Sequence, residues 1–336
     1  MSRKQIILIT GANGEIGKNL IDYLSNVGSN NIVTLDLQPL EETSKIYKHI
    51  TGSILDQQII DDINAEYEIT AIYHLAAMLS TKSEYSPFNA NQVNVNGTLN
   101  LIDLAIKQGV MSNSPIQFFF PSSIAVYGMD THNPNPIKEE EYLFPKTIYG
   151  MNKLYCEQLG VYFSNNYHRL TKDYSPGLLD FRSIRFPGLI SITTHPTGGT
   201  SDYIPEMLHS AASRNQGYSC FVNKDTRLPF MIMPDAIDAI YKLMNVQKSY
   251  LKNQIYNISA FSPSVEEFHN KILNYFPNFS ITYDVSDERQ KMVDGWPSDV
   301  CCKRALYDWD WKPKYNLDNA FSEYFIPYLK SKVLNT

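Results

Sequence analysis

Two residues of this sequence, Tyr149 and Lys153, could together remove a proton from an alcohol. Because they are four residues apart, their side chains lie on the same face of a helix. A free tyrosine has a pKa of about 10, too high for an effective base at neutral pH. We expect the Lys153 ammonium to lower that pKa, since an opposite charge about 4 Å away stabilises the phenolate by roughly 4 kcal/mol at an effective dielectric of about 20. The pair predicts a general base that acts while hydride leaves the substrate carbon.

A third residue, Ser123, follows the apolar segment Phe118–Ser122, which is typical of a strand. A hydroxyl at the end of a strand can hydrogen-bond the reacting oxygen and orient it. Tyr-x-x-x-Lys alone is a weak pattern in a chain with 23 tyrosines, where an exposed helical pair is the default interpretation. The three residues in this order, each in the expected strand or helix, predict a catalytic set of Ser123, Tyr149 and Lys153.

A phosphate-binding turn is predicted near the N terminus. The apolar run Ile6–Thr10 leads into Gly-Ala-Asn-Gly-Glu-Ile-Gly at residues 11–17 and then into a helical pattern. Glycines let the backbone approach a ligand, and the N terminus of a helix favours a pyrophosphate. Glycine turns also join many other strands to helices, so its place directly after the first buried strand carries the prediction. The expected cofactor contacts in this turn are Gly11, Asn13, Gly14, Glu15, Ile16 and Gly17.

Asp36 predicts which dinucleotide binds. It follows the second strand, Ile32–Leu35, where a carboxylate can accept hydrogen bonds from both adenosine ribose hydroxyls. The same carboxylate would repel a 2′-phosphate, so NAD is favoured over NADP. A solvated loop carboxylate is the alternative. We expect Asp36, with Leu37 beside it, in the cofactor site.

These motifs require a parallel sheet with crossover helices, and the first half of the chain alternates accordingly. We predict an α/β, doubly wound (Rossmann) sheet with a smaller, discontinuous substrate-binding lobe. The NAD-binding domain covers residues 1–186, completed by roughly 228–260, and the lobe covers 187–227 and 261–336. Strands are predicted at Gln5–Thr10, Asn31–Leu35, Ala71–Leu75, Gln117–Pro121, Phe181–Phe186 and Gln254–Ile258, and helices near Gly14–Ser25, Asp56–Ile63 and Asn91–Gln108 and after Tyr149.

The composition indicates a soluble globular protein and excludes several partners. The chain has 336 residues, 43% of them hydrophobic, and a net charge of −6 without a basic stripe, so neither nucleic acid nor an anionic membrane is expected. No apolar run could span a bilayer, and from the residues at its start we expect no secretory signal. The four cysteines show neither disulfide nor zinc spacing. We expect a cytoplasmic enzyme with reduced thiols and no metal, a mature mitochondrial form being the alternative.

With these motifs in order, the sequence resembles the extended short-chain dehydrogenases, which include nucleotide-sugar epimerases and dehydratases. Further motifs shared with that superfamily are His74–Ala77, Asn94–Thr98 and Arg185–Gly188. Ser53 stands where many relatives have an acid. Leu75–Ala77 could also be plain strand core. The resemblance implies further cofactor contacts at Ser53, Ile54, Leu75, Ala76, Ala77, Asn94, Tyr149, Lys153 and Pro187.

A narrower resemblance is to the short-chain-type L-threonine 3-dehydrogenases. It rests on Arg185–Ser191, Gly198–Tyr203, Leu228–Asp235 and Trp296-Pro297. It implies that a Gly-Gly-Thr loop closes over a small amino acid whose ammonium pairs with Asp202, while Trp296 excludes water. Asp202 could instead cap the helix Tyr203–Ser213, and Trp296 could be a core anchor. The implied substrate contacts are Ser80, Ser123, Tyr149, Gly199, Thr200, Asp202 and Trp296. One departure is the segment Leu170–Leu178, which is longer than the family pattern.

The resemblance implies NAD-dependent oxidation of the L-threonine 3-hydroxyl to L-2-amino-3-oxobutanoate, a step of threonine catabolism. It also implies a homodimer through the helices after Asn91 and Tyr149. A nucleotide-sugar epimerase or dehydratase is the alternative, although the lobe shows no obvious basic cluster for a diphosphate. A redox-sensing NAD-binding protein would not need an intact Ser-Tyr-Lys set. Zinc-dependent threonine dehydrogenases are excluded by the lack of a ligand cluster.

Overall fold

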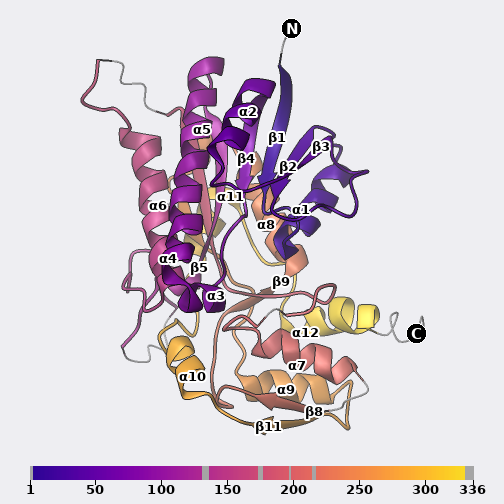
Figure 1. The fold of residues 1–336 in the computed structure, drawn as a ribbon. Coiled ribbons are helices and arrows are strands. Elements are labelled where there is room, and N and C mark those ends of the chain that lie inside the picture. The colour runs from indigo at the N-terminus through magenta and orange to yellow at the C-terminus, as the bar shows by residue number, and fades with distance from the viewer. Residues whose placement is uncertain (1–2, 131–135, 173–176, 197, 214–216, 330–336) are drawn as a thin grey trace. The chain divides into compact units, whose positions relative to one another are not determined.

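The computed structural model describes residues 3–130, 136–172, 177–196, 198–213 and 217–329, which form two compact units (Figure 1). Unit 1 consists of Met1–Ser122, Ile148–Ile184 and Ala239–Ile255, and unit 2 of Ser123–Thr147, Arg185–Asp238 and Tyr256–Thr336. The segment 123–147, which the sequence placed in the NAD-binding domain, belongs to unit 2. Its backbone pairs there with the C-terminal part of the chain, as in the bridge between Ile137 and Val300.

Unit 1 is built on a seven-stranded sheet with the order β10-β6-β5-β4-β1-β2-β3. β1 pairs in parallel with both β2 and β4, so the strand order reverses at β1. Ligands of doubly wound sheets bind at the carboxyl ends of the strands at such a reversal. The predicted fold class is therefore confirmed. The strands are β1 (Lys4–Thr10), β2 (Ile32–Asp36), β3 (Lys48–Thr51), β4 (Tyr67–His74), β5 (Ile116–Ser123), β6 (Leu179–Phe186) and β10 (Ile255–Asn257), and β5, β6 and β10 end in residues of unit 2.

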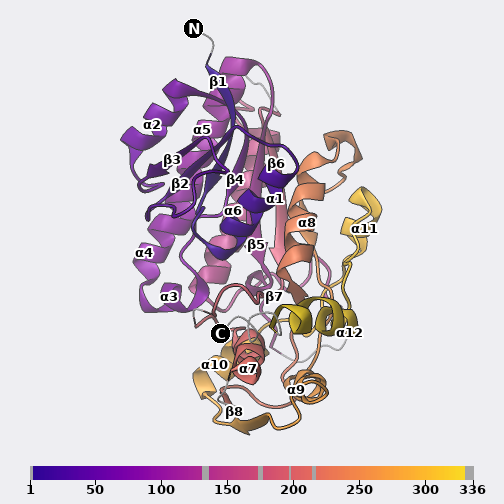
Figure 2. The ribbon, with the colours of Figure 1, turned by 90° about the vertical axis from the view of Figure 1, so that its right-hand side faces the viewer.

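Helices pack on both faces of this sheet, with α2 (Gln57–Glu66), α5 (Gly97–Ser112) and α6 (Ile148–Asn166) along one face and α1 (Glu15–Asn26) on the other (Figures 1 and 2). α1 forms because Leu20, Ile21 and Leu24 recur at helical spacing and are buried. The second half of α8 (Met233–Asn245) lies against α1, where the Tyr23 and Tyr241 rings are 5.0 Å apart. These contacts fix the glycine turn at the start of α1.

The predicted helix Asn91–Gln108 is interrupted. Short helices α3 (Ser80–Tyr85) and α4 (Pro87–Asn91) come first, and a π-helix, η1 (Gln92–Asn96), joins α4 to α5. A π-turn has a wider hydrogen-bonding register than an α-helix and is often found at functional sites. The helical periodicity was present in the sequence, but this change of register was not predicted.

Unit 2 contains two small parallel sheets. β7 (Gly188–Ile190) pairs with β9 (Phe230–Ile232), and β8 (Gly217–Cys220) pairs with β11 (Ser280–Tyr283). Aromatic side chains fill its core, among them Tyr203 and Phe230. Residues 173–176 of the long segment Leu170–Leu178 lie outside the described residues. The helices of unit 2 are α7 (Tyr203–Ala212), α9 (Val265–Leu273), α10 (Asp287–Asp294), α11 (Lys303–Trp309) and α12 (Leu317–Asn319), with the first turn of α8 and shorter turns at Ile124–Val126 and Ala320–Phe325.

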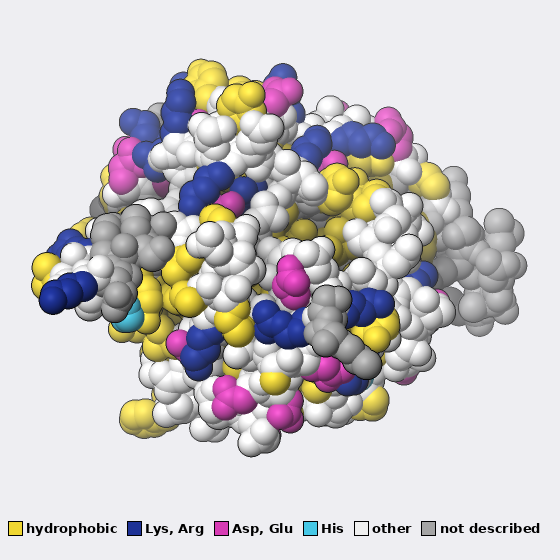
Figure 3. Space-filling model, turned by 90° about the horizontal axis from the view of Figure 1, so that it is seen from above, with side chains coloured by type: hydrophobic (Ala, Val, Ile, Leu, Met, Phe, Trp, Pro, Cys, Tyr) yellow, Lys and Arg dark blue, Asp and Glu magenta, His cyan; other side chains and the backbone are white. Residues whose placement is uncertain are grey.

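Basic and acidic side chains are interspersed on the face of the molecule shown in Figure 3, without a continuous basic stripe. This distribution agrees with the charge pattern of the sequence. Within the described residues, no helix combines the length and apolar character that crossing a membrane would need.

Candidate active site

The two predicted proton-transfer residues lie in the first turns of α6. Lys153 is buried, and its Nζ donates a hydrogen bond to the Pro121 carbonyl oxygen at 2.7 Å. The same ammonium lies 4.6 Å from the centre of the Phe120 ring and 5.4 Å from the centre of the Tyr149 ring. Both residues therefore lie beside the end of β5, on the carboxyl side of the sheet.

The expected lowering of the Tyr149 pKa is not found. Desolvation by the surrounding protein raises the pKa of the Tyr149 phenol above its ordinary value. Burial likewise lowers the pKa of Lys153 to about 8. The physical reason is that the ammonium is directed to the Pro121 carbonyl, so desolvation outweighs attraction between the two groups. Extra positive charge beside the ring would be needed to favour the phenolate.

Ser123 is the last residue of β5 and the first residue of unit 2. Its hydroxyl oxygen accepts a hydrogen bond from the backbone N–H of Ala125 at 3.1 Å, which caps the short helix Ile124–Val126. The hydroxyl proton remains available to donate, because the oxygen acts as the acceptor in this bond. The alignment of Ser123 with Tyr149 stays a prediction.

The glycine turn forms a backbone cradle that side chains would fill. Gly11 has a φ of +70°, and a Cβ atom there would lie 2.5 Å from the Ala76 nitrogen. A Cβ atom on Gly17 would lie 2.5 Å from the Gly11 oxygen. Gly14 caps α1 and has no side chain to bind the first-turn N–H groups, where Glu15 and Ile16 lie. This geometry fits a pyrophosphate, which accepts hydrogen bonds from a helix N terminus.

Asp36 lies at the end of β2 beside this turn. Its Oδ2 accepts a hydrogen bond from the Asn13 N–H at 2.9 Å, and its Oδ1 accepts one from the Gln38 N–H at 3.0 Å. Leu37 is exposed next to it. The carboxylate is therefore held near the glycine turn, where a ribose hydroxyl could donate to it, and the residues present fit an adenine dinucleotide.

Two other segments of unit 1 approach the same edge of the sheet. Leu75, Ala76 and Ala77 directly follow β4, and the Leu75 N–H donates to the Thr10 carbonyl oxygen at 3.0 Å. Ile54 is buried against Gly97, where a Cβ atom would lie 2.3 Å from Ile54 Cδ1. Unit 1 also contains Ser53, Asn94 and Ser80. The Ser53 hydroxyl accepts a hydrogen bond from the Leu55 N–H, and the Asn94 side chain binds the Met78 backbone. Ser80 is the first residue of α3.

The predicted substrate loop lies in unit 2. Asp202 is at the N-cap of α7, but its side chain does not cap the first turn. Its Oδ2 accepts a hydrogen bond from the Gly199 N–H at 2.6 Å instead, which holds the loop closed on itself. Thr200 is buried within the loop. Pro187, before β7, is also buried.

Trp296 is 7% exposed and lines a cavity of about 350 Å³ in unit 2. The other polar lining residues include Asn223, Arg227, Gln290 and Asp294, but neither Thr200 nor Asp202. The indole Nε1 has no hydrogen-bond partner in the described residues. A role of Trp296 at the substrate therefore stays a prediction.

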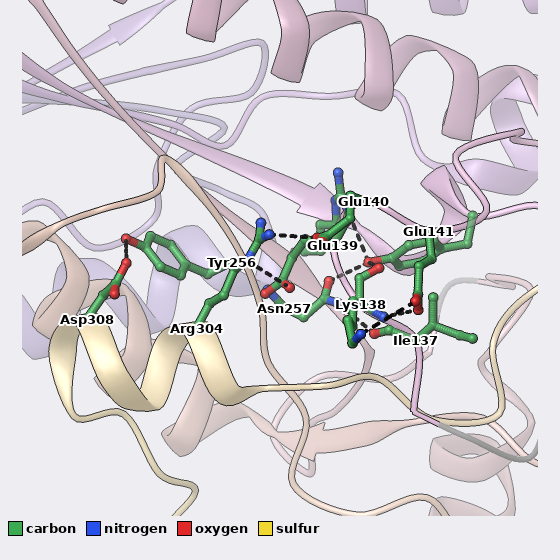
Figure 4. Close-up of polar contacts among 11 residues, drawn as sticks. Ile137, Lys138, Glu139, Glu140, Glu141, Tyr256, Asn257, Arg304 and Asp308 are labelled. Atoms are coloured by element: carbon green, nitrogen blue, oxygen red, sulfur yellow. Dashed lines mark hydrogen bonds and ion pairs between the residues drawn. The ribbon is translucent and has the colours of Figure 1, made fainter.

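The motif Arg185–Gly188 is anchored by a buried polar network that was not predicted. Arg185 Nη1 donates to the Glu139 carbonyl oxygen at 2.6 Å and to the Tyr127 hydroxyl at 2.9 Å. Glu139 Oε1 accepts a hydrogen bond from the Asn257 N–H at 3.1 Å, and Glu139 Oε2 lies 3.5 Å from Arg304 Nε (Figure 4). Burial raises the pKa of Glu139. In the sequence, Arg185 and Asn257 stand out as polar residues within largely apolar segments, whereas Glu139 lies in the charged run Lys138–Glu141 and gave no such signal.

Comparison with known proteins identifies the family. The model of the NAD dependent epimerase/dehydratase family matches residues 7–259, which is most of the chain. The chain belongs to this family. It is thus an NAD-dependent enzyme, and the glycine turn, Asp36 and α6 all lie within the matched residues. Among the described residues, no cluster of three or more His, Cys, Asp or Glu side chains could hold a metal ion.

Several proteins similar to this chain are named as L-threonine dehydrogenases. Mitochondrial L-threonine 3-dehydrogenase of Bos taurus is 33% identical over 94% of the chain and 80% of its own length. A monomeric L-threonine 3-dehydrogenase from a metagenome has a TM-score of 0.85 at 36% identity, with 97% of this chain and 99% of that chain covered. The holo form of an L-threonine dehydrogenase from Cupriavidus necator gives 0.85 at 32% identity, with 98% and 99% covered.

Proposed function

We propose that the protein is an NAD-dependent L-threonine 3-dehydrogenase, which oxidises the 3-hydroxyl of L-threonine to L-2-amino-3-oxobutanoate in threonine catabolism. The observation that carries the proposal is one arrangement in unit 1. A glycine cradle with Asp36 beside it lies on the same sheet edge as Tyr149 and Lys153. The names of relatives at 32–36% identity over nearly the whole chain support the choice of substrate.

In this proposal Tyr149 accepts the proton of the 3-hydroxyl. Ser123, whose hydroxyl proton is available, donates to the same oxygen and orients it. NAD, when bound, would supply the acceptor for the hydride from the substrate carbon and a positive charge. Lys153 holds a second positive charge on the same helix face. Together these charges oppose the desolvation that raises the Tyr149 pKa.

We further propose that unit 2 holds the amino acid through the loop Gly199–Asp202. The Gly199 N–H holds one Asp202 oxygen in place, so the carboxylate is preorganised for an ammonium group. This close approach requires glycine at position 199, because a Cβ atom there would lie 2.7 Å from Asp202 Oδ1.

The first test is NADH formation by the purified enzyme with NAD and a panel of L-threonine, L-serine and a UDP-sugar. We expect turnover of L-threonine, and discrimination against serine of roughly 1–3 kcal/mol, because serine lacks only one methyl group. Asp202→Asn keeps an acceptor for the Gly199 N–H but removes the charge. It should raise KM for L-threonine roughly tenfold to a hundredfold, since a charge-assisted hydrogen bond contributes about 1.5–3 kcal/mol.

The matched control is Asp287→Asn, which removes an exposed carboxylate in the first turn of α10 and should leave KM unchanged. An enzyme that ignores L-threonine but epimerises the UDP-sugar would refute the proposed substrate. Arg227 argues against that outcome, because its guanidinium already binds Glu267 and the Ser262 carbonyl oxygen.

We also propose a homodimer through α6 and its neighbours. Met151, Tyr155 and Tyr162 are exposed along α6, and Tyr85 and Phe88 of the adjoining α3 and α4 are 84% and 87% exposed. Apolar surface of this extent on packed helices is typical of a subunit interface. Sedimentation should give a dimer, and Tyr155→Glu should give a monomer. A wild type that sediments as a monomer, as the metagenomic relative is described, would refute this interface.

A reducing compartment such as the cytoplasm fits this enzyme. All four cysteines are free thiols, and Cys156 and Cys220 are buried. Structural disulfides are common in oxidising compartments and rare in the cytosol. We propose this location on that basis.

A further inference from the structure

Five buried polar residues of unit 1 form a continuous series of hydrogen bonds from β1 to the catalytic helix α6. Each is at most 4% exposed. Thr10 ends β1 directly before Gly11, and His74 ends β4. The series continues through helices α5 and η1 to α6, where its last member directly precedes Lys153. In order, the residues are Thr10, His74, Thr98, Asn94 and Asn152.

The donors and acceptors of this series point in one direction. Thr10 Oγ1 accepts from the Ala76 N–H at 3.3 Å, so its own proton can be donated to His74 Nδ1, 2.9 Å away. Burial lowers the pKa of His74 to about 3, so the imidazole is neutral and carries one proton. With Nδ1 as the acceptor, that proton lies on Nε2 and is donated to Thr98 Oγ1 at 2.9 Å. The Thr98 hydroxyl donates in turn to the backbone carbonyl oxygen of Asn94 at 2.5 Å.

The far end of the series holds the catalytic helix. Asn94 lies in the π-turn η1, and its Nδ2 is 3.4 Å from Asn152 Oδ1 on α6. The thiol of Cys156, also on α6, donates to the Asn94 carbonyl oxygen at 3.2 Å. The carbonyl that Thr98 binds is thus also bound by the helix that carries Lys153.

We propose that His74 is a positioning residue, which sets the glycine turn through Thr10 and the catalytic helix through Thr98. Its imidazole links two parts of the series, which we call the Thr10 arm and the Thr98 arm after the residue that each ring nitrogen contacts. The Thr10 arm fixes the turn against Ala76, with which any Cβ atom on Gly11 would collide. The Thr98 arm fixes η1 against α6. The kinetic part of the inference rests on the proposed function, and the part on cofactor binding does not.

Two substitutions separate the arms. His74→Gln places an amide near Nε2 and keeps a donor for Thr98, but loses the acceptor for Thr10. His74→Asn keeps an acceptor near Nδ1 and loses the donor. We expect His74→Gln to weaken NAD binding roughly tenfold with kcat nearly unchanged. We expect His74→Asn to lower kcat roughly tenfold or more with NAD affinity nearly unchanged, because small displacements of reacting groups are costly.

Thr98 supplies a matched pair that is independent of the histidine. Thr98→Val removes the hydroxyl at nearly constant volume and should reproduce the loss of kcat. Thr98→Ser restores the hydroxyl and should recover most of it. If Thr98→Val fails to fold, the Thr98→Ser enzyme with wild-type kcat and the two His74 variants still decide the question.

The tautomer is tested directly by ¹⁵N NMR of the imidazoles, with the His74 signals identified by their loss in His74→Gln. We expect protonated Nε2 and unprotonated Nδ1. Protonated Nδ1 would overturn the direction of the series. Variants that lower Tm but leave kcat and the NAD Kd unchanged would show that His74 is only structural. A wild type that binds NAD without oxidising L-threonine refutes the proposed substrate alone, since NAD affinity and the tautomer still test His74.

Discussion

Tyr149→Phe is expected to lower kcat by about 10²–10⁴-fold, because the substitution removes only the oxygen that accepts the substrate proton. NAD affinity should remain near the wild-type value. In the wild type, kcat should rise with pH through one deprotonation, since the phenolate is the active form and burial raises the Tyr149 pKa. Steady-state kinetics and NAD titration, each measured across a pH series, check both parts.

The control for this substitution is Tyr162→Phe, which removes a phenol oxygen from an exposed position on the same helix. It should leave kcat unchanged. A Tyr149→Phe enzyme with near-normal kcat would remove the phenol from the mechanism. Equal losses of kcat and NAD affinity would indicate instead that the ring is needed for cofactor binding.

Gly11→Ala is expected to abolish measurable NAD binding. The added methyl group would lie 2.5 Å from the Ala76 nitrogen and 2.6 Å from the Leu75 carbonyl carbon, which are backbone atoms that cannot rotate away. Either the turn or the segment after β4 must move, so the cradle opens. Calorimetric titration with NAD measures the loss.

Gly28→Ala is the control that separates collision from backbone strain. Gly28 also has a positive φ, +92°, but nothing lies within 4 Å of its added Cβ atom. We expect a cost of roughly 1–2 kcal/mol in the free energy of unfolding and no change in NAD affinity. If both variants lose NAD equally, general destabilisation explains the effect. If Gly11→Ala binds NAD normally, the cradle does not hold the cofactor.

Individual strands and helices could be predicted from the sequence because residues close together in the chain specify them. The strand before Gly11 and the helix after it show their buried pattern within a short stretch. β3 (Lys48–Thr51) was missed because it is polar and largely unburied, and only its pairing with β2 makes it a strand. The π-turn was missed for a similar reason. The bonds that accompany it come from Thr98 and from Cys156, which is remote in sequence.

In the candidate site, too, features set by nearby residues could be predicted and features set by residues remote in sequence could not. Residue types and spacing placed Tyr149 and Lys153 on one helix and Asp36 at the end of a strand, where the structure has them, and their roles stay predictions. The direction of the Tyr149 pKa could not be read from the sequence, because it depends on how completely the folded protein buries the phenol. The cavity beside Trp296 likewise combines residues from three separate stretches of unit 2.

The interleaving of the two units also constrains how the chain folds during synthesis. The polypeptide crosses from one unit to the other five times, after residues 122, 147, 184, 238 and 255. Neither unit is therefore complete when the first half of the chain has left the ribosome. Domains that are continuous in sequence fold one after another from the N terminus. Here the central sheet must wait for β10, and in the interval the edge of β6 that will pair with it is an open strand edge of the kind that promotes aggregation.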